Sequence, residues 1–189
     1  MPLKPILFLI LTLVNLGWQP APPPIFTCSK GSISFTSDAP MELIQAKSMD
    51  MKGAFKSSDR TFAFRVAMNT FEGFNDPLQQ EHFCEKFLEC EQHPYAVFRG
   101  RLIEDYDFSQ PGTYEVRAKG TLDIHGVERE RIIPVQMKCS ETGIEVEANF
   151  SVQLDDHDIR IPQVVYQKVA EEILVSISAQ LQPTQSDDS

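Results

Sequence analysis

Four histidines are the residues of this sequence best suited to hold a metal ion, and they stand in four separate segments: His82, His93, His125 and His157. Imidazole is the commonest metal ligand in proteins, and the strand order derived below would bring all four segments to one end of the molecule. No two of them, however, have the helical i, i+4 or strand i, i+2 spacing that aims both rings at one ion. His125 with Gly126 also fits a tight hairpin turn. The spacing therefore predicts no metal site.

Other patterns that support catalysis are missing from the sequence. It contains no nucleophile elbow, no glycine loop that cradles phosphate and no zinc-type cysteine pair. The acidic run of Asp155, Asp156 and Asp158 lacks the glycine and the bidentate glutamate of a calcium loop, which favours a solvated loop. We therefore expect a protein that is not an enzyme and has no catalytic residues.

Alternating apolar and polar residues fill most of the chain and predict β-strands, because successive strand side chains point to opposite faces. We expect eight strands, over residues 32–35, 42–48, 61–70, 96–104, 113–124, 130–138, 144–154 and 173–181. Eight mostly antiparallel strands predict an all-β fold in which the sheet closes into an up-and-down barrel. A β-sandwich is the alternative at this level.

One segment, between the third and fourth expected strands, breaks the alternation. Asp76 is suited to cap a helix, Pro77 to its first position and Gln79 to the partner position of a capping box. An apolar stripe with helical spacing follows, made of Phe83, Phe87 and Cys90. We expect a short helix here that lies over one end of the barrel, either as a plug for the core or as a gate for a ligand.

The four cysteines allow three pairings in an oxidising compartment. Cys28 precedes the first strand and Cys139 follows the sixth, whereas Cys84 and Cys90 lie in the connection at the opposite end. A strand of about eight residues at roughly 3.3 Å each separates the two ends by far more than the ~7 Å limit between bonded Cα atoms. The sequence thus predicts a Cys84–Cys90 disulfide and a Cys28–Cys139 disulfide. The first requires the helix to end or distort before Cys90, because six helical residues rise about 9 Å.

The first 24 residues predict an export signal. Lys4 precedes an apolar run over residues 6–16, and a proline-rich exit segment follows over residues 19–24. The run is shorter than the roughly 20 residues of a membrane span. We expect no integral span after signal removal, with an uncleaved anchor as the alternative. Residues 27–182 then form the barrel domain, and the polar residues 183–189 form a disordered tail.

The net charge of −10 bears on possible partners. Nucleic-acid binders need a basic surface, so no nucleic-acid partner is expected. Anionic membrane surfaces are disfavoured for the same reason. A homodimer is left open by the sequence.

Several motifs together resemble those of a known family. They are LQQEHF at 78–83, HPYAVFRG at 93–100, GTLDIHGV at 120–127, DIRIP at 158–162 and KVAEEI at 168–173. In kind, order and spacing they resemble the YceI-like proteins, most closely the branch of Bacteroidetes-type bacteria, over residues 31–181. The resemblance implies a lipocalin-like barrel, periplasmic or secreted in the bacterial envelope, that holds a polyisoprenoid such as an isoprenoid quinone or prenyl phosphate. It implies no catalytic residues and no cofactor apart from this lipid. The chain departs from the family pattern at Cys84 and Cys90.

The residues that we expect to line a ligand cavity lie on the dry faces of the strands and of the helix. They are Phe62, Phe64, Val66, Phe83, Phe87, Phe98, Leu102, Leu122, Ile124 and Phe150. We expect residues 76–88 and 155–165 to form the mouth. The alternative is that these side chains fill a solid core. The protein would then be an interaction or structural module of the envelope, with no ligand.

Overall fold

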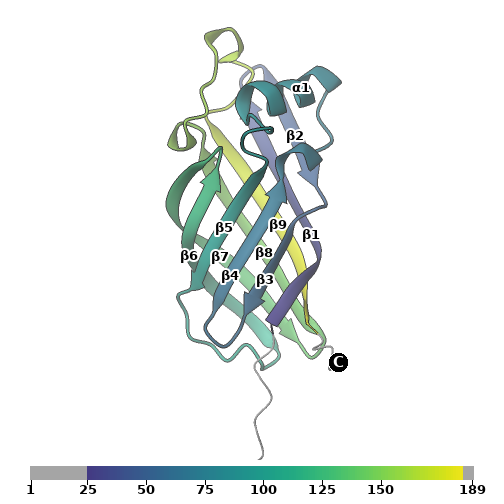
Figure 1. Cartoon of the computed structure of the whole chain (residues 1–189), viewed down its shortest axis with the longest axis vertical. Helices are drawn as coiled ribbons and strands as arrows, with labels where there is room; N and C mark the ends of the chain where they lie inside the picture. Colours follow the sequence, from purple (N-terminus) through teal and green to yellow (C-terminus); the bar gives the residue numbers. More distant parts are fainter. Residues whose placement is uncertain (1–24, 185–189) are drawn as a thin grey trace, which may run out of the picture.

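Nine strands form one antiparallel sheet that closes into a barrel through pairing of β1 with β9 (Figure 1). The computed structural model describes residues 25–184. The predicted export signal and residues 185–189 of the predicted tail lie outside the described residues. The strands are β1 (Ile25–Ala39), β2 (Glu42–Ser48), β3 (Lys52–Lys56), β4 (Thr61–Ala67), β5 (Tyr95–Leu102), β6 (Gly112–Ile124), β7 (Val127–Ser140), β8 (Gly143–Gln153) and β9 (Glu172–Pro183).

The strands β2 and β3 share one position in the barrel wall. β2 pairs with β1 from Ile33 to Ala39, and β3 pairs with β1 from Ile25 to Thr27. Both run antiparallel to β1, so the wall has eight positions and every strand direction is as expected. The predicted eight-stranded barrel is confirmed, with β3 as an extra strand. Alternation does not predict β3, because Gly53 and Ala54 give its five residues little apolar contrast.

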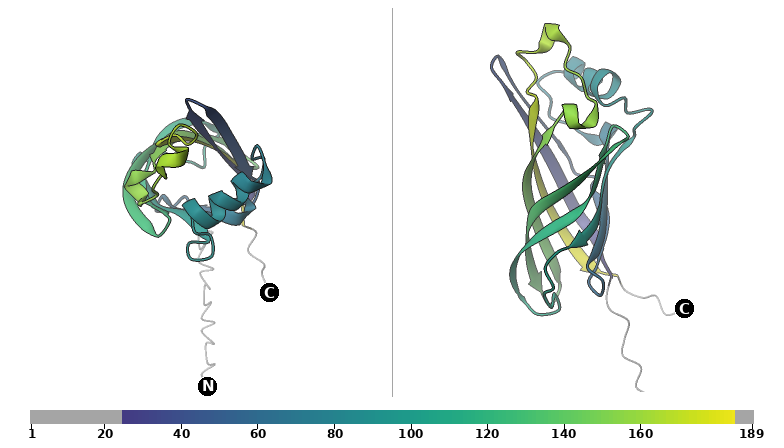
Figure 2. Two further views of the ribbon diagram at one scale, coloured as in Figure 1. Left: turned by 90° about the horizontal axis from the view of Figure 1, so that it is seen from above. Right: turned by 90° about the vertical axis from the view of Figure 1, so that its left-hand side faces the viewer.

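The short helical segments all lie at one end of the barrel, which we call the upper end (Figure 2). They are η1 (Met68–Thr70), α1 (Pro77–His82), the π-helix η2 (Phe83–Phe87), η3 (Asp155–His157) and η4 (Gln163–Val165). The start of β1 and the end of β9 mark the lower end, where Phe26 pairs with Pro183. Within residues 25–184, no helix is long and apolar enough to cross a membrane.

The hairpin of β6 and β7 turns at the upper end through two residues. Ile124 pairs with Val127, and the residues between them, His125 and Gly126, have φ angles of 57° and 72°. Two successive positive φ angles are the signature of a two-residue type I′ turn, whose twist matches that of the flanking strands. The tight turn expected from the sequence is therefore present. It fixes the direction of the His125 side chain.

The backbone pairing of β7 with β8 differs between the lower and the upper end of the barrel wall. Pairing runs from Gln136 to Ser140 on β7 and from Gly143 to Glu147 on β8, and among the described residues it goes no further. Pro134, which has no backbone N–H to donate, lies just above the point where pairing stops. Higher up, the Arg131 guanidinium Nη2 donates to the Ser151 carbonyl at 2.6 Å. A side chain thus takes the place of the ladder in the upper part of this seam.

The interior of the lower half is filled by buried side chains. Phe108, from the connection after β5, packs edge-on against Phe55 at 5.5 Å between ring centroids, and it also contacts Tyr114. Higher in this core, Gly100 and Gly120 pair directly across β5 and β6. A Cβ on Gly100 would lie 2.2 Å from the Lys119 carbonyl oxygen. These glycines therefore let two strands approach closely, rather than leave room beside the aromatic rings.

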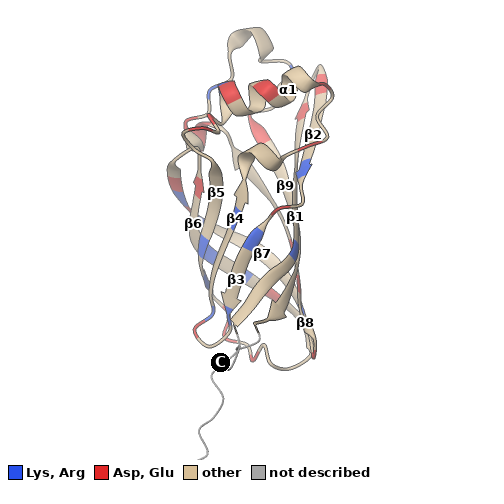
Figure 3. Ribbon diagram, turned by 45° about the vertical axis from the view of Figure 1, so that its right-hand side comes forward, with Lys and Arg blue, Asp and Glu red and all other residues tan. Residues whose placement is uncertain are grey.

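Acidic and basic residues are scattered over the strands and their connections (Figure 3). Arg99 pairs with Glu128 at 2.6 Å, and Arg117 pairs with Glu104 at 2.7 Å. Such exposed pairs stabilise a fold by at most about 1 kcal/mol each. Their main effect is to keep the outer face of the sheet in water and the opposite face toward the interior.

Candidate functional site

The upper half of the barrel encloses a cavity of about 530 Å³. Its wall is the inner face of the strands, and its cover is formed by the segments around α1, η2 and η4 (Figure 2). Val164 and Leu78 line it while remaining 90% and 55% exposed. The cavity therefore reaches the surface at the upper end.

The strands that line the cavity contribute mainly aliphatic side chains. Alternate residues of each strand face inward, which follows from the period of two in a β-strand. The lining strand residues are Ile33, Phe35, Ser37, Glu42, Ile44, Val66, Ala96, Leu122, Ile124, Phe150, Val152, Ile173 and Val175. Two of them are polar: Glu42, at the start of β2, and Ser37, whose hydroxyl accepts a hydrogen bond from the Ala170 backbone N–H at 2.9 Å.

The cover of the cavity is centred on Phe83, at the start of η2. Its ring stacks on Phe35 of β1 at 5.5 Å with an interplanar angle of 12°. It also contacts Phe74 at 5.2 Å and Phe71 at 5.7 Å. Each aromatic pair contributes about 0.5–1.5 kcal/mol beyond the burial of its area. This cluster attaches the cover to one side of the barrel and leaves the space beside it free.

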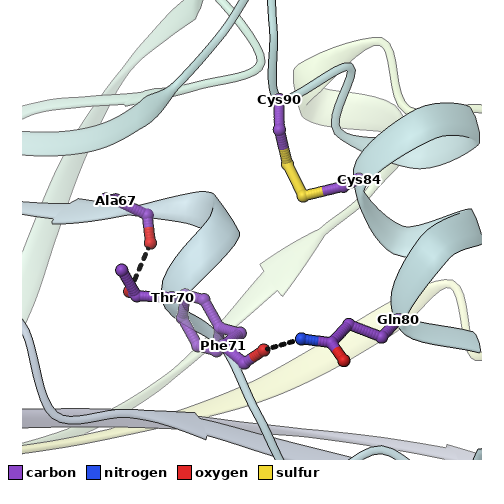
Figure 4. Close-up of a disulfide and its surroundings, with 6 residues drawn as sticks. All are labelled: Ala67, Thr70, Phe71, Gln80, Cys84 and Cys90. Atoms are coloured by element: carbon purple, nitrogen blue, oxygen red, sulfur yellow. Dashed lines mark hydrogen bonds between the residues drawn. A yellow bond between two sulfur atoms is a disulfide. The ribbon is translucent and has the colours of Figure 1, made fainter. Parts of the chain in front are cut away.

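Polar contacts fix the start of α1. The Asp76 side chain accepts a hydrogen bond from the Gln79 backbone N–H at 2.9 Å, as expected of a helix cap. The Gln79 side chain departs from a capping box, since it accepts from the Asn75 backbone N–H at 3.1 Å and donates to Glu42 of β2. The next residue, Gln80, donates through Nε2 to the Phe71 carbonyl at 3.0 Å (Figure 4). The cover is therefore bound to β2 and to the segment after η1.

A disulfide joins Cys84 to Cys90 and closes the cover behind η2, with 4.9 Å between the Cα atoms (Figure 4). The helix ends before Cys90, because η2 stops at Phe87 and Glu89 takes a φ of 45°. The predicted pairing and its condition are both confirmed.

The predicted Cys28–Cys139 disulfide is wrong, and these two thiols are free in the described structure. Both do lie at the lower end, in one row across the wall: Cys28 pairs with Leu181, Leu181 with Ile144 and Ile144 with Cys139. Two strands therefore separate the cysteines. At about 4.8 Å per strand spacing they are roughly 14 Å apart along the wall, beyond the ~7 Å limit. Knowing the end of the barrel does not give the distance around it.

The fold and the cavity can now be compared with known proteins. Residues 27–181 match the YceI-like domain model. The chain belongs to the YceI-like family. Among curated proteins, none gives a significant sequence match.

Solved structures resemble this YceI-like barrel at low sequence identity. A polyisoprenoid binding domain from Saccharophagus degradans implicated in plant cell wall breakdown aligns with a TM-score of 0.71 and 12% identity, over 84% of this chain and 98% of that chain. BcnA from Burkholderia cenocepacia aligns at 0.65 and 11%, over 79% and 95%. The YceI protein of Campylobacter jejuni aligns at 0.56 and 12%, over 72% and 82%. These likenesses show the fold.

The residues predicted to line a cavity in this YceI-like domain divide by height in the barrel. Those that line the cavity are Val66, Phe83, Phe87, Leu122, Ile124 and Phe150. The other four lie in or against the filled lower core and do not line the cavity: Phe62, Phe64, Phe98 and Leu102. The contact of Phe62 with Phe98, at 4.9 Å between centroids, shows how this lower region is closed. Alternation identifies the inner face of a strand but not the height at which the interior becomes hollow.

Two aromatic lining residues of the cover were not predicted from the sequence. Phe71 and Phe74 lie in a segment without regular period, between η1 and α1. The density of phenylalanine between residues 71 and 87 was an available signal. The two segments predicted to form the mouth, residues 76–88 and 155–165, both contribute to the lining.

The rim of the cavity carries both signs of charge. Lys86 and Lys168 line it together with Glu42 and Asp76. Lys168 Nζ lies 3.9 Å from Glu42 Oε2. A polar group held at this level would meet both donors and acceptors, while anything deeper would meet hydrocarbon.

Proposed function

We propose that this protein is an exported lipid-binding protein that holds a polyisoprenoid chain in its upper cavity. The observation that carries the proposal is a cavity of about 530 Å³, lined mainly by aliphatic and aromatic side chains. This volume lies within the roughly 300–1,000 Å³ of typical ligand sites. The similar fold of a polyisoprenoid binding domain from Saccharophagus degradans supports the class of ligand.

The energetics of an apolar site favour a long hydrocarbon chain. Burial of each CH₂ group contributes about 0.8 kcal/mol, while association costs about 4–15 kcal/mol. A chain of ten carbons would only balance that cost. A polyisoprenoid of several units would exceed it without a specific polar contact, which suits the strand lining described above.

The rim suits the head of such a lipid, of the isoprenoid quinone or prenyl phosphate type. Lys86 and Lys168 would attract a phosphate, and the nearby Glu42 and Asp76 would keep the local charge close to balance. The head would therefore stay at the mouth, where water solvates it, with the chain below. The roles of this arrangement would be carriage, storage or sensing of the lipid.

Export is supported by the cysteine chemistry as well as by the sequence of the first 24 residues. The Cys84–Cys90 disulfide suits an oxidising compartment, because cytosolic thiols are kept reduced. Both features support our proposal that the protein works in the periplasm or outside the cell.

The proposal is tested by mass spectrometry of organic extracts from protein purified natively out of its own host. A polyisoprenoid should co-purify in a molar ratio approaching one. The variant Ala96→Trp adds an indole ring to the inner face of β5 and should abolish this occupancy. Its matched control is Val97→Trp, one residue along on the opposite face of the same strand. Equal lipid in both folded variants would contradict the proposal.

The alternative is an envelope interaction module whose barrel core is filled. Only the lower half of the barrel has such a filled core. In the upper half the side chains leave a cavity of about 530 Å³. Extracts that contained no lipid, from a native preparation of the folded protein, would favour that alternative.

A further inference from the structure

Two histidines and one glutamate that are far apart in the sequence meet beside the cover. Glu89 and His93 lie in the connection between η2 and β5, and His125 lies in the β6–β7 turn. One ligand atom from each of the three side chains lies within 4.8 Å of the other two. The spacing of the histidines along the chain does not predict this cluster, because it is neither helical nor strand-like. The fold supplies the proximity.

The hydrogen bonds of His125 leave one ring nitrogen directed at a carboxylate. Nδ1 lies 3.2 Å from the His157 backbone carbonyl, and Nε2 lies 3.3 Å from Glu89 Oε2. A carbonyl oxygen only accepts, so Nδ1 must carry the hydrogen. In the neutral ring Nε2 then presents a lone pair to a carboxylate, and two acceptors face each other. A cation between them resolves this arrangement, either as a proton on Nε2 or as a metal ion.

The bond from Nδ1 to a backbone carbonyl is also what metal-binding histidines commonly make. Such a bond fixes the tautomer and the ring orientation, and it makes the other nitrogen a better ligand. The carbonyl is itself held in place, because the buried His157 ring bonds the Val127 carbonyl through Nδ1 at 2.9 Å. His125 is thus oriented before any ion arrives.

The second histidine is held by the same turn. The rings of His93 and His125 lie 4.8 Å apart between centroids at an angle of 69°. The His93 ring also rests against Gly126, where an added Cβ would come within 2.7 Å of its Nδ1. Gly126 is therefore required twice, for its positive φ and for the space that His93 occupies.

The disulfide accounts for the position of Glu89. Cys90 is its neighbour, and the Cys90 backbone N–H donates to the Cys84 carbonyl at 2.9 Å. The His93 N–H donates to the Glu89 carbonyl at 2.9 Å, which closes one turn and brings both side chains to one side. Glu89 adopts a φ of 45°, a conformation that residues other than glycine rarely take and that clusters at functional sites.

We propose that Glu89, His93 and His125 form a binding site for a divalent transition-metal ion of the zinc type. Two imidazole nitrogens and one carboxylate oxygen are ligands that Zn²⁺ accepts in four-coordinate sites, with water at the fourth position. Calcium and magnesium prefer oxygen ligands throughout. Bonds of about 2.0–2.2 Å place tetrahedral ligands roughly 3.4 Å apart. His125 Nε2 and Glu89 Oε2 already have this separation, and the widest pair of ligand atoms, at most 4.8 Å apart, must approach by up to about 1.4 Å. The Glu89 side chain, which is 44% exposed, is free to make that movement.

A bound ion would join the cover to the barrel wall, because Glu89 follows η2 and His125 lies in the turn between β6 and β7. This inference does not depend on the identity of the lipid. It is tested on the disulfide-intact protein after treatment with a chelator. Isothermal titration with Zn²⁺ should give one ion per chain, and Co²⁺ should give the visible absorption bands of a tetrahedral site.

The variants E89Q and H93Q should each weaken Zn²⁺ binding at least about 100-fold, since loss of an outer partner alone costs 10–100-fold. Their matched controls are E91Q, an exposed carboxylate on the same connection, and H82Q, a histidine of the cover outside the cluster. Both controls should bind as the wild type does. Hydrogen exchange over residues 83–93 should slow when Zn²⁺ is added.

Three outcomes would overturn the proposal. An absence of stoichiometric Zn²⁺ binding to the folded protein would mean that the three side chains do not form a metal site. Binding that survives both E89Q and H93Q would place the ion elsewhere. Hydrogen exchange over residues 83–93 that is unchanged at saturating Zn²⁺ would also place the ion elsewhere.

Discussion

The lower and upper halves of the barrel share the same strands but differ in what fills them. In the lower half, aromatic rings from several strands and from the β5–β6 connection meet at the centre, as Phe55, Phe62 and Phe108 do. In the upper half the wall is mainly aliphatic, and most of the aromatic rings belong to the cover, where they pack on one another around Phe83. Ring placement, rather than strand number, decides which half is solid.

The two halves also differ in how the wall is held. Below, β7 and β8 pair through their backbones, and β3 completes the wall beside β1. Above, Arg131 bridges the separated strands, and a disulfide and side-chain contacts hold the cover. Segments with few backbone ladders open at the lowest free-energy cost. We therefore expect contacts in the lower half to determine the free energy of global unfolding. Local opening of the upper half would then admit a ligand.

The largest expected effect distinguishes the two halves by stability. Phe55→Ala removes a ring that is 2% exposed from the filled core, and should lower the free energy of unfolding by about 3–5 kcal/mol. Phe150→Ala is the matched variant, because that ring borders the existing cavity and loses fewer contacts. It should cost less than half as much. Urea denaturation of both variants measures this, and equal losses would remove the distinction between a solid and a hollow half.

The next effect concerns the cover. The double variant Cys84→Ser with Cys90→Ser opens a short loop, so global stability should fall by about 2 kcal/mol or less. Hydrogen exchange over residues 77–93 should accelerate far more than exchange in β6 and β7. The control is Cys28→Ser, which removes a free thiol and should leave exchange over residues 77–93 unchanged. Acceleration spread evenly over the barrel would mean that the cover and the wall unfold together.

The comparison of halves explains what the sequence could predict. Strand alternation, the cap at Asp76 and the turn at His125 depend on local periods and local backbone conformation, and each is present in the structure. The division of the inner face into cavity and core depends on ring packing between distant segments. Phe83 and Phe35 are separated by 48 positions, yet their rings stack. No local period contains that information.

The failed disulfide and the histidine cluster have a common cause. Strand direction places a residue at one end of the barrel, and this was correct for the cysteines and for the histidines. The distance around the wall requires the register of every intervening pair, as the row from Cys28 through Leu181 and Ile144 to Cys139 shows. Sequence alternation defines faces, but it does not fix how the helical connections fold back, which is what brings Glu89 to His125.

A smaller effect makes the upper half sensitive to pH. Burial lowers the pKa of His157, outweighing the nearby Asp156 and the Val127 carbonyl, which raise it. The unfolded chain therefore takes up a proton near pH 6.5, while the folded protein does so only at lower pH. The free energy of unfolding should fall as the pH drops through 6.5. His157→Asn keeps a donor for the Val127 carbonyl but does not titrate. Urea curves at pH 7.5 and 5.5 should show a smaller pH dependence for this variant, and an identical dependence would contradict the assignment.

The smallest effect leaves stability unchanged and concerns the thiols of the lower half. Burial raises the pKa of both Cys28 and Cys139, so little reactive thiolate is present in the folded protein. With iodoacetamide at pH 8, Cys139 should react only on unfolding, and the half-buried Cys28 should react sooner. Denatured but unreduced protein should gain two labels in its intact mass, because Cys84 and Cys90 are bonded. No label would mean that Cys28 and Cys139 are bonded, and the strand order between them would then be wrong. Four labels would mean that the cover has no disulfide, and rapid native labelling of Cys139 would mean that the lower half is not the closed one.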